Sequence, residues 1–294
     1  MRSGTEINKG SDTVHQMAGP LFSNLSLIEQ YNNIITADLP SNKLLSDGPL
    51  WGQYNRIFPI KITLRLLANL LSQNPELELE YFRENASDFA RRLGMQLLDV
   101  DKTKKRTRGE RLSTALPVGE NPFKSKNRFK NHFIGYVDNR GVFQGAPGKL
   151  KFVSFHKKNA YNICITRPGL EFSLLKNPIL DGNISNGDSL SEEEKLYYIE
   201  HIKNHVPSEY DAMMFILTNI SEGHNRPDDL TQILQKKYAN WTKSQANTIR
   251  SGLLSRMFEL GLIYRDRLGL REIKYVLSID GIKLMNLYIN KDNL

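Results

Sequence analysis

The chain has little that could cross-link it or anchor it in a membrane. Its 294 residues include a single cysteine, Cys164, so no disulfide can form within the chain. Chains without disulfides are typical of reducing compartments. No apolar run is long enough to span a bilayer, and the N-terminus lacks the pattern of a secretory signal peptide. We therefore expect a cytoplasmic protein that does not contact a membrane.

Motifs for familiar catalytic chemistry are also missing. The sequence has neither a phosphate-binding glycine loop nor a G-x-S-x-G nucleophile elbow. His201 and His205 have the spacing of two helical zinc ligands, but no cysteine or obvious third ligand accompanies them. Asp228, followed much later by Glu272-x-Lys274, mimics a metal-dependent nuclease signature, but these residues fall in an expected helix and an expected hairpin. We therefore expect no catalytic residue, metal or cofactor in this chain.

Positive charge, in contrast, is plentiful and concentrated. The net charge is +8, and residues 101–158 hold fifteen Lys/Arg against four Asp/Glu. That segment alone carries +11, which leaves −3 for the rest of the chain. Charge gathered in this way indicates a polyanionic partner such as nucleic acid. The alternative is a basic surface that is simply solvated.

Helical and extended patterns alternate along the first two thirds of the chain. Residues 1–20 are polar and aperiodic, which predicts a flexible arm. Apolar residues recur at helical spacing over 60–73 and 76–94, and Gly94 is typical of the position after a helix C-terminus. Asn121-Pro122 predicts the start of a short helix that ends at Gly135. A glycine-rich turn and strands over 150–155 and 161–166 follow.

The remainder repeats this order after a boundary at 176–190, which is rich in Gly, Asn, Ser and Asp. Ser191 and Glu194 form a capping box that opens a connecting helix over 191–206. Helices are expected over 208–221, 227–240 and 242–261, then strands over 262–265 and 272–277.

Two similar junctions close the two halves. In "NICITRPGLEFS", a strand pattern meets a helix pattern at Thr166-x-x-Gly169, and in "YVLSIDGIKLMN" it does so at Ser278-x-x-Gly281, 112 residues later. Ser and Thr are good N-caps because the hydroxyl accepts a free backbone N–H of the first turn. Three helices, a hairpin and a closing helix are the order of a winged helix-turn-helix. We expect a mainly α fold with small β wings: an arm (1–20), two winged helix-turn-helix subdomains (21–180 and 208–294), and a linker with a connecting helix (181–207).

The third helix of such a unit lies in the DNA major groove. In the expected helix over 242–261, the core positions are Ile249, Leu253, Met257 and Leu260. The opposite face, which then points to solvent, has no acidic residue over 242–256. Lys and Arg pair with guanine edges, and Asn and Gln pair with adenine edges; a solvated helix face is the alternative. The candidate base-reading residues are Lys124, Lys126, Asn127, Arg128, Asn131, Lys243, Ser244, Gln245, Asn247, Arg250 and Ser251.

Further basic residues suit contacts to phosphates, which give affinity but little sequence information. They are Lys104, Lys105, Arg106, Arg108, Lys130, Lys149, Lys151, Lys157, Lys158 and the helix cap Thr242. Arg2 and Lys9 on the arm could enter a groove, although a tail that contacts nothing is the alternative. Trp51 and Trp241 are expected to be packing residues rather than stacking platforms.

Four stretches resemble the DNA-recognition half of FokI-like type IIS restriction endonucleases, over roughly residues 50–290. They are "ITRPGLEFSLLKNPILDG", "EEEKLYYIEHIKNHVPSEYDAMMFILTNI", "RSGLLSRMFELGLIY" and "LSIDGIKL". The resemblance rests on the order of the modules and on the junction motifs. By position, the resemblance implies that the helices which read DNA are 123–135 and 242–256. This chain shows two modules, whereas the recognition half of the family has three.

This resemblance implies that the chain binds a short asymmetric site in double-stranded DNA, as a monomer in the bacterial cytoplasm. It also implies that cleavage belongs to a separate C-terminal nuclease domain, which would hold Mg²⁺. Because the chain stops soon after the second expected subdomain, we expect no DNA cleavage by this chain.

Two other classes stay open. A winged-helix transcription regulator or replication initiator would share the fold but would usually dimerise and bind palindromes or repeats. A self-contained nuclease would use Asp228, Glu272 and Lys274 and would cut plasmid DNA in magnesium.

Overall fold

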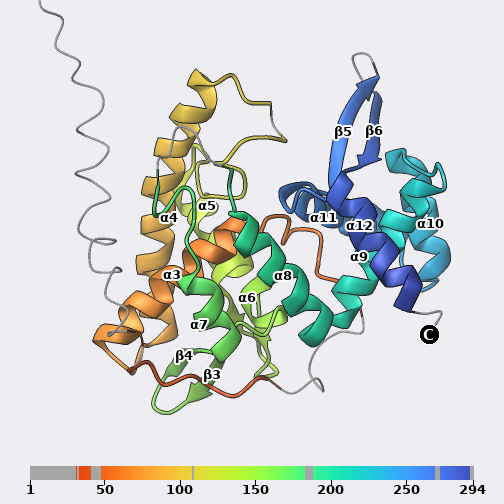
Figure 1. Ribbon diagram of the computed structural model, residues 1–294. Coiled ribbons are helices and arrows are strands. Elements are labelled where there is room, and N and C mark those ends of the chain that lie inside the picture. Colours follow the sequence, from red (N-terminus) through yellow and green to blue (C-terminus); the bar gives the residue numbers. More distant parts are fainter. Residues whose placement is uncertain are drawn as a thin grey trace, which may run out of the picture.

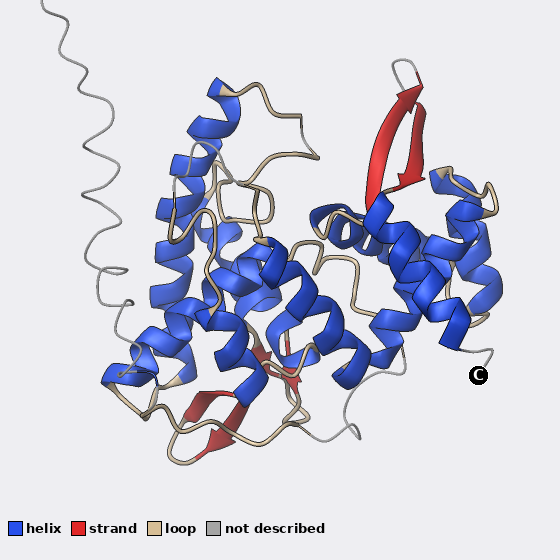
Figure 2. Ribbon diagram, viewed as in Figure 1, coloured by secondary structure: helices blue, strands red, loops and turns tan. Residues whose placement is uncertain are grey.

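The computed structural model describes residues 31, 33–40, 48–107, 109–182, 188–268 and 272–291. Within these ranges the chain is mainly helical, with three two-stranded antiparallel sheets. Figures 1 and 2 show a larger helical body, a smaller C-terminal body, and a connecting helix beside the larger one. The expected mainly α class with small β elements is therefore confirmed. The predicted arm, with Arg2 and Lys9, lies outside the described residues.

The larger body takes up the first half of the chain. Its helices are α3 (Phe58–Gln73), α4 (Leu79–Thr103), α5 (Pro122–Phe129), the π-helical turn η3 (Lys130–Ile134), α6 (Ala146–Lys149) and α7 (Arg167–Leu174). Its strand pairs are β1 (Tyr136–Val137) with β2 (Phe143–Gln144), and β3 (Val153–Lys157) with β4 (Tyr161–Ile165).

The smaller body follows the connecting helix α8 (Glu192–His205). It consists of α9 (Pro207–Ser221), α10 (Pro227–Lys237), α11 (Lys243–Glu259), the hairpin of β5 (Ile263–Leu268) and β6 (Glu272–Leu277), and α12 (Ile279–Lys291). This order of three helices, two strands and a helix agrees with the sequence expectation for 208–294.

Side-chain caps fix several helix starts as the sequence predicts. Asn121 accepts the N–H of Lys124 at the start of α5. Ser191 and Glu194 form a complete capping box at the start of α8. Both devices satisfy backbone donors that a helix leaves unpaired at its first turn.

The end of α4 differs from the expectation. The helix continues through Gly94 to Thr103, so Gly94 is not a terminating residue. A β-carbon on Gly94 would lie 2.8 Å from Val118 and 2.9 Å from Leu116. The glycine is therefore required because the loop after α4 packs directly on that face of the helix.

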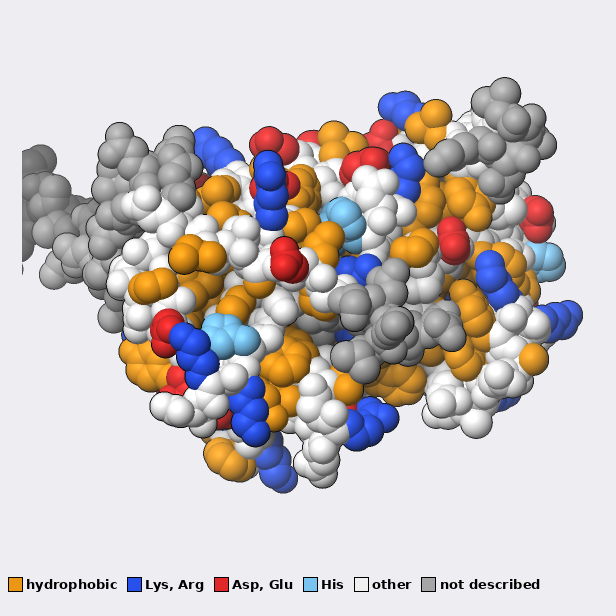
Figure 3. Space-filling model, turned by 90° about the horizontal axis from the view of Figure 1, so that it is seen from below, with side chains coloured by type: hydrophobic (Ala, Val, Ile, Leu, Met, Phe, Trp, Pro, Cys, Tyr) orange, Lys and Arg blue, Asp and Glu red, His pale blue; other side chains and the backbone are white. Residues whose placement is uncertain are grey.

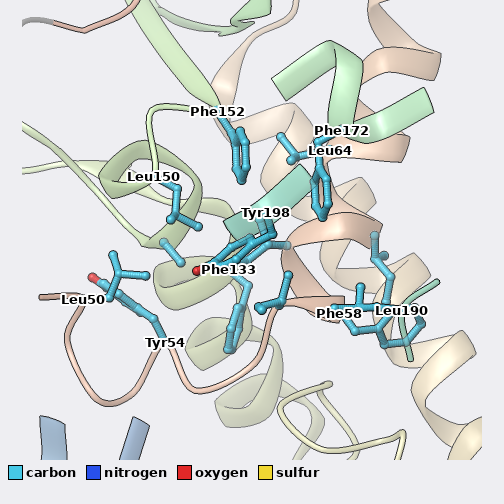
Figure 4. Packing of buried hydrophobic residues seen from close by; sticks show 14 of the residues in the cluster. Leu50, Tyr54, Phe58, Leu64, Phe133, Leu150, Phe152, Phe172, Leu190 and Tyr198 are labelled. Carbon is cyan, nitrogen blue, oxygen red and sulfur yellow. The ribbon is translucent and has the colours of Figure 1, made fainter. Parts of the chain in front are cut away.

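A single cluster of buried apolar side chains runs through both bodies. Figure 4 shows its centre, where Tyr198 of α8 lies among Phe58 and Leu64 of α3 and Phe133 of η3. Tyr198 is fully buried. The connecting helix is thus part of the core of the larger body.

Buried charges connect α8 to α3. The Lys61 ammonium lies 2.8 Å from the Glu194 carboxylate, and both side chains are fully buried. Lys61 also donates to the carbonyl oxygens of Phe172 (2.6 Å) and Leu175 (2.7 Å), at the end of α7. A buried charge requires such partners, because it loses its hydration.

Polar contacts also attach the segment 48–58 to the smaller body. Glu259 on α11 accepts the N–H groups of Ile57 (2.6 Å) and Phe58 (3.2 Å), and so caps the start of α3. Glu209 on α9 accepts the N–H of Leu50 at 2.7 Å. A segment assigned from the sequence to the first subdomain therefore lies against the second, as the orange loop of Figure 1 shows.

The two junction motifs have the same structure. The N–H of Gly169 donates to the Thr166 hydroxyl at 3.2 Å, and the N–H of Gly281 donates to the Ser278 hydroxyl at 2.9 Å. The predicted caps are confirmed at both places.

The structure adds a reason for the glycine in each motif. A β-carbon on Gly169 would lie 2.0 Å from the carbonyl oxygen of Phe152, and one on Gly281 would lie 2.1 Å from that of Leu262. Phe152 and Leu262 are the residues just before β3 and β5. In both halves, the closing helix therefore packs its first turn on the carbonyl that precedes the hairpin.

The repeat extends to the helix before each hairpin. The N–H groups of Phe152 and Leu262 each donate to the carbonyl five residues earlier, at 2.9 Å. Lys151 (φ 60°) and Gly261 (φ 72°) occupy the same left-handed position in this turn. The short α6 therefore has the same position before the β3–β4 hairpin as the end of α11 has before the β5–β6 hairpin. The expected match of 123–135 with α11 is interrupted, because β1, β2 and α6 lie between η3 and the β3–β4 hairpin.

His201 is a core residue of this repeat. Its Nε2 lies 2.6 Å from the carbonyl oxygen of Leu150, and its ring stacks on Phe152 at 4.2 Å. Burial lowers the pKa of His201 to about 4. The Nε2 atom of His201 is therefore engaged inside the protein.

We expect the fold to lose stability as the pH falls from about 6.5 to about 4, because the unfolded chain protonates His201 first. His201→Gln keeps a donor for Leu150 without titrating. In this variant, the loss in the free energy of unfolding between pH 6.5 and pH 4 should be smaller by up to roughly 3 kcal/mol. Urea unfolding at several pH values measures this. The exposed His224→Gln is the control, and equal pH profiles for both variants would contradict the assignment.

Candidate nucleic-acid interface

Helix α11 presents its first half to solvent in a fixed orientation. Thr242 and Gln245 form a reciprocal capping box at its start, with distances of 3.2 and 2.8 Å. Ile249, Leu253 and Met257 are buried, as the helical spacing predicts. The exposed residues on the other side include Lys243, Ser244, Gln245, Asn247 and Ser251.

Arg250 differs from these residues. Its guanidinium donates to the carbonyl oxygen of Pro227 (2.6 Å) and to the Thr231 hydroxyl (2.8 Å), both on α10. Burial lowers the pKa of Arg250. We therefore correct its expected role: Arg250 holds α10 against α11 and does not point at a ligand.

The predicted residues on α5 are available to different degrees. Lys124 and Arg128 are exposed, and Asn127 is half-buried. Lys126 pairs with Asp88 on α4 at 2.7 Å. The Asn131 side chain accepts from Arg83 at 3.0 Å. Lys124 and Arg128 are thus the α5 side chains best placed to contact a ligand.

Two of the predicted phosphate contacts are held inside the larger body. Lys130 is only 8% exposed, and its ammonium lies 2.5 Å from Glu84. Arg106 pairs with the buried Asp101 at 3.2 Å. These two residues do not fit the expected role. Lys104 and Lys105 are exposed as predicted, and Arg108 lies outside the described residues.

The lysines around the β3–β4 hairpin are also divided. Lys151 is buried, and Lys158 pairs with Glu76. Lys157 is exposed, with its ammonium 5.5 Å from the Tyr161 ring centre. Figure 3 looks onto this side of the molecule and shows acidic and basic side chains interspersed with apolar ones. The basic segment of the sequence therefore does not form a uniformly basic patch on this face.

An open cleft of about 1400 Å³ lies between the two bodies. The larger body contributes Arg140 and Lys149, the 48–58 segment contributes Trp51, and the smaller body contributes Lys237 and Trp241. None of the described residues that line it is acidic. The two bodies thus share one surface to which both contribute cations, of which Arg140 is paired with Asp138.

Lys149 is the most unusual cation of this cleft. It is half-buried, and burial lowers the pKa of its ammonium group. No described residue gives it a hydrogen bond or an ion pair. Lys237 is also partly desolvated, which lowers its pKa, and its ammonium lies 4.1 Å from the Phe215 ring centre. Asp138 and Asp211 act on these two lysines without forming an ion pair with them, so each ammonium group could accept an anion as a direct partner.

The cleft was largely missed by sequence reasoning. Of its lining residues, only Lys149 and Gln245 were candidates. The signal that could have found it is the position of the two tryptophans, Trp51 and Trp241, because both line the cleft. They were interpreted as packing residues alone.

The three residues that a self-contained nuclease would use lie on α10 and β6. Asp228 is exposed at the start of α10, and Glu272 and Lys274 lie on β6. Within the described ranges, no three His, Cys, Asp or Glu side chains are grouped as metal ligands would be.

No protein family, curated protein or solved structure matches the chain. In the part of the chain that the structure describes, every helix is too short or too polar to cross a bilayer. The function is therefore argued from the surfaces described above.

Proposed function

We propose that the chain recognises a short asymmetric site in double-stranded DNA, with α11 as its principal reading helix. The observation that carries this proposal is the outer face of α11. Its exposed side chains include Lys243, Gln245 and Asn247, and no acidic residue occurs between 242 and 256. Such residues pair with base edges in the major groove.

The surroundings of α11 support a winged helix-turn-helix arrangement. Arg250 fixes α10 on α11, and the β5–β6 hairpin follows directly as a wing. In the larger body the repeated unit has only the short α6 at the corresponding place, so α5 supplies its exposed cations, Lys124 and Arg128. Unlike units on one chain favour an asymmetric site bound by a monomer.

This function fits the recognition part of a type IIS restriction endonuclease. In that arrangement a separate nuclease domain would cut the DNA and hold Mg²⁺, and the chain described would only position it. Incubation with plasmid and magnesium should leave the DNA supercoiled.

Selection of bound duplexes from a randomised library tests the proposal. We expect one short asymmetric motif. A palindrome or direct repeat would favour a dimeric regulator. If the bound duplexes share no motif, α11 contacts only phosphates and the proposal is wrong.

Asn247→Ala should lower discrimination at one base pair of the selected motif by about 1–3 kcal/mol, because a bidentate contact to a base edge is lost. Binding titrations against every single-base variant of the motif measure this. The control is Asn204→Ala, an exposed asparagine on α8. If the variant keeps the same base preference at every position of the motif, Asn247 does not contact a base edge.

A further inference from the structure

We propose that the cleft between the two bodies binds a single-stranded segment of nucleic acid, at a site that adjoins the outer face of α11 and shares Gln245 with it. This goes beyond duplex recognition, because stacked and paired bases cannot present their faces to a protein wall. The cleft combines aromatic surfaces with cations, which is the combination that binds single strands.

The aromatic surfaces come from two separate segments of the chain. Trp241 stacks on Tyr238 with ring centres 4.0 Å apart and planes within 11° of each other. This pair forms a rigid platform at the turn between α10 and α11. Trp51, on the 48–58 segment, is 39% exposed. Base stacking on such side chains tolerates any sequence, because every base has an aromatic face.

The cations come from both bodies. Among the described residues, neither Lys149 nor Lys237 forms an ion pair, and the Lys237 ammonium lies over the Phe215 and Tyr238 rings. Arg140 lies 2.9 Å from Asp138 and also lines the cleft. Phosphate groups would give Lys149 and Lys237 a direct ion pair, which Asp138 and Asp211 do not form with them.

The size of the cleft favours a strand over a single small molecule. Its volume of about 1400 Å³ exceeds the roughly 300–1,000 Å³ that is usual for small-ligand pockets. Several linked nucleotides would fill it, with bases on the rings and phosphates at the lysines.

Intrinsic fluorescence reports on this site directly, because both tryptophans of the chain line the cleft. Titration of the whole chain with oligothymidylate at low salt should quench the emission, and added salt should reverse the quenching. Lys149→Met and Trp51→Ala should each weaken binding by roughly tenfold. Because Trp51→Ala removes one reporter, its affinity is measured by anisotropy of a labelled oligonucleotide.

Matched controls lie outside the cleft. Lys236→Met changes the neighbour of Lys237, and Tyr81→Ala removes an aromatic side chain that is 58% exposed on α4. Neither should change oligothymidylate binding. Absence of quenching, or equal losses for Lys149→Met and Lys236→Met, would overturn the cleft proposal.

A parallel duplex titration separates this inference from the proposed function. If the selected duplex binds but oligothymidylate does not, only the cleft proposal fails. If oligothymidylate binds, tolerates Asn247→Ala, and no duplex motif can be selected, only the duplex proposal fails.

Discussion

Arg256→Met is expected to lower the free energy of unfolding by about 3–5 kcal/mol, because it leaves a buried carboxylate without its counter-charge. Arg256 and Glu209 are fully buried, and the guanidinium lies 2.6 Å from the carboxylate. Arg256 also donates to the carbonyl oxygen of Tyr54 at 2.6 Å. In the variant, the Glu209 carboxylate still accepts the N–H of Leu50 but has lost the guanidinium that balanced its charge. Urea denaturation measures the loss.

The control for this variant is Arg167→Met, whose side chain is 83% exposed and pairs with Glu171. An exposed pair of this kind contributes less than about 1 kcal/mol. Combining Arg256→Met with Glu209→Gln should restore part of the stability, because both charges are then removed. If Arg256→Met and Arg167→Met lose the same stability, the buried pair contributes no more than an exposed one.

The same ion pair sets the shape of the cleft. Leu50 and Tyr54 are fixed to the smaller body through Glu209 and Arg256, and Trp51 lies between them in the sequence. The position of the Trp51 wall therefore depends on a charge pair inside the smaller body. A loss of this pair should weaken oligothymidylate binding together with stability.

Features that depend on neighbours in the sequence were predictable. The buried side of α11 follows from a spacing of three to four residues, and Ile249 and Leu253 are buried accordingly. The caps at Asn121 and Ser191 also act within one helical turn. Local patterns specify these elements because the residues involved are close along the chain.

Features that depend on distant partners were not predictable. Gly94 has the sequence signal of a helix end, but packing of Leu116 against it makes it an interior residue. Lys130 belongs to a basic stretch, yet Glu84, which is 46 residues earlier, neutralises it. A count of charges along the sequence cannot show which cations the fold pairs internally.

The candidate site combines both cases. The exposed stripe with Asn247 was predicted, because one helix carries it. The cleft was not, because Trp51, Lys149 and Trp241 come from three separate segments. The repeat was detected in the order of elements and at the junctions, but the match of 123–135 with α11 was not correct, since β1, β2 and α6 alter the spacing within the first half.

Gly169→Ala and Gly281→Ala should each destabilise the fold by about 3 kcal/mol or more, as in severe overpacking. In each variant the new methyl group would overlap a backbone carbonyl oxygen, at 2.0 Å from Phe152 and 2.1 Å from Leu262. Backbone atoms of a packed turn cannot move aside as a flexible side chain can. The closing helix must therefore tilt away from its hairpin in both variants, and urea denaturation measures the loss.

The control is Gly48→Ala, where the nearest atom to a new methyl group, on Trp241, is 3.7 Å away. Because the two junctions lie in different bodies, the losses of Gly169→Ala and Gly281→Ala should add in the double variant. If only one of the two variants lowers the free energy of unfolding, the two junctions have the same hydrogen bonds, but only one of them needs the close contact between helix and hairpin. Equal losses would establish the close approach of helix and hairpin as the common element of both halves.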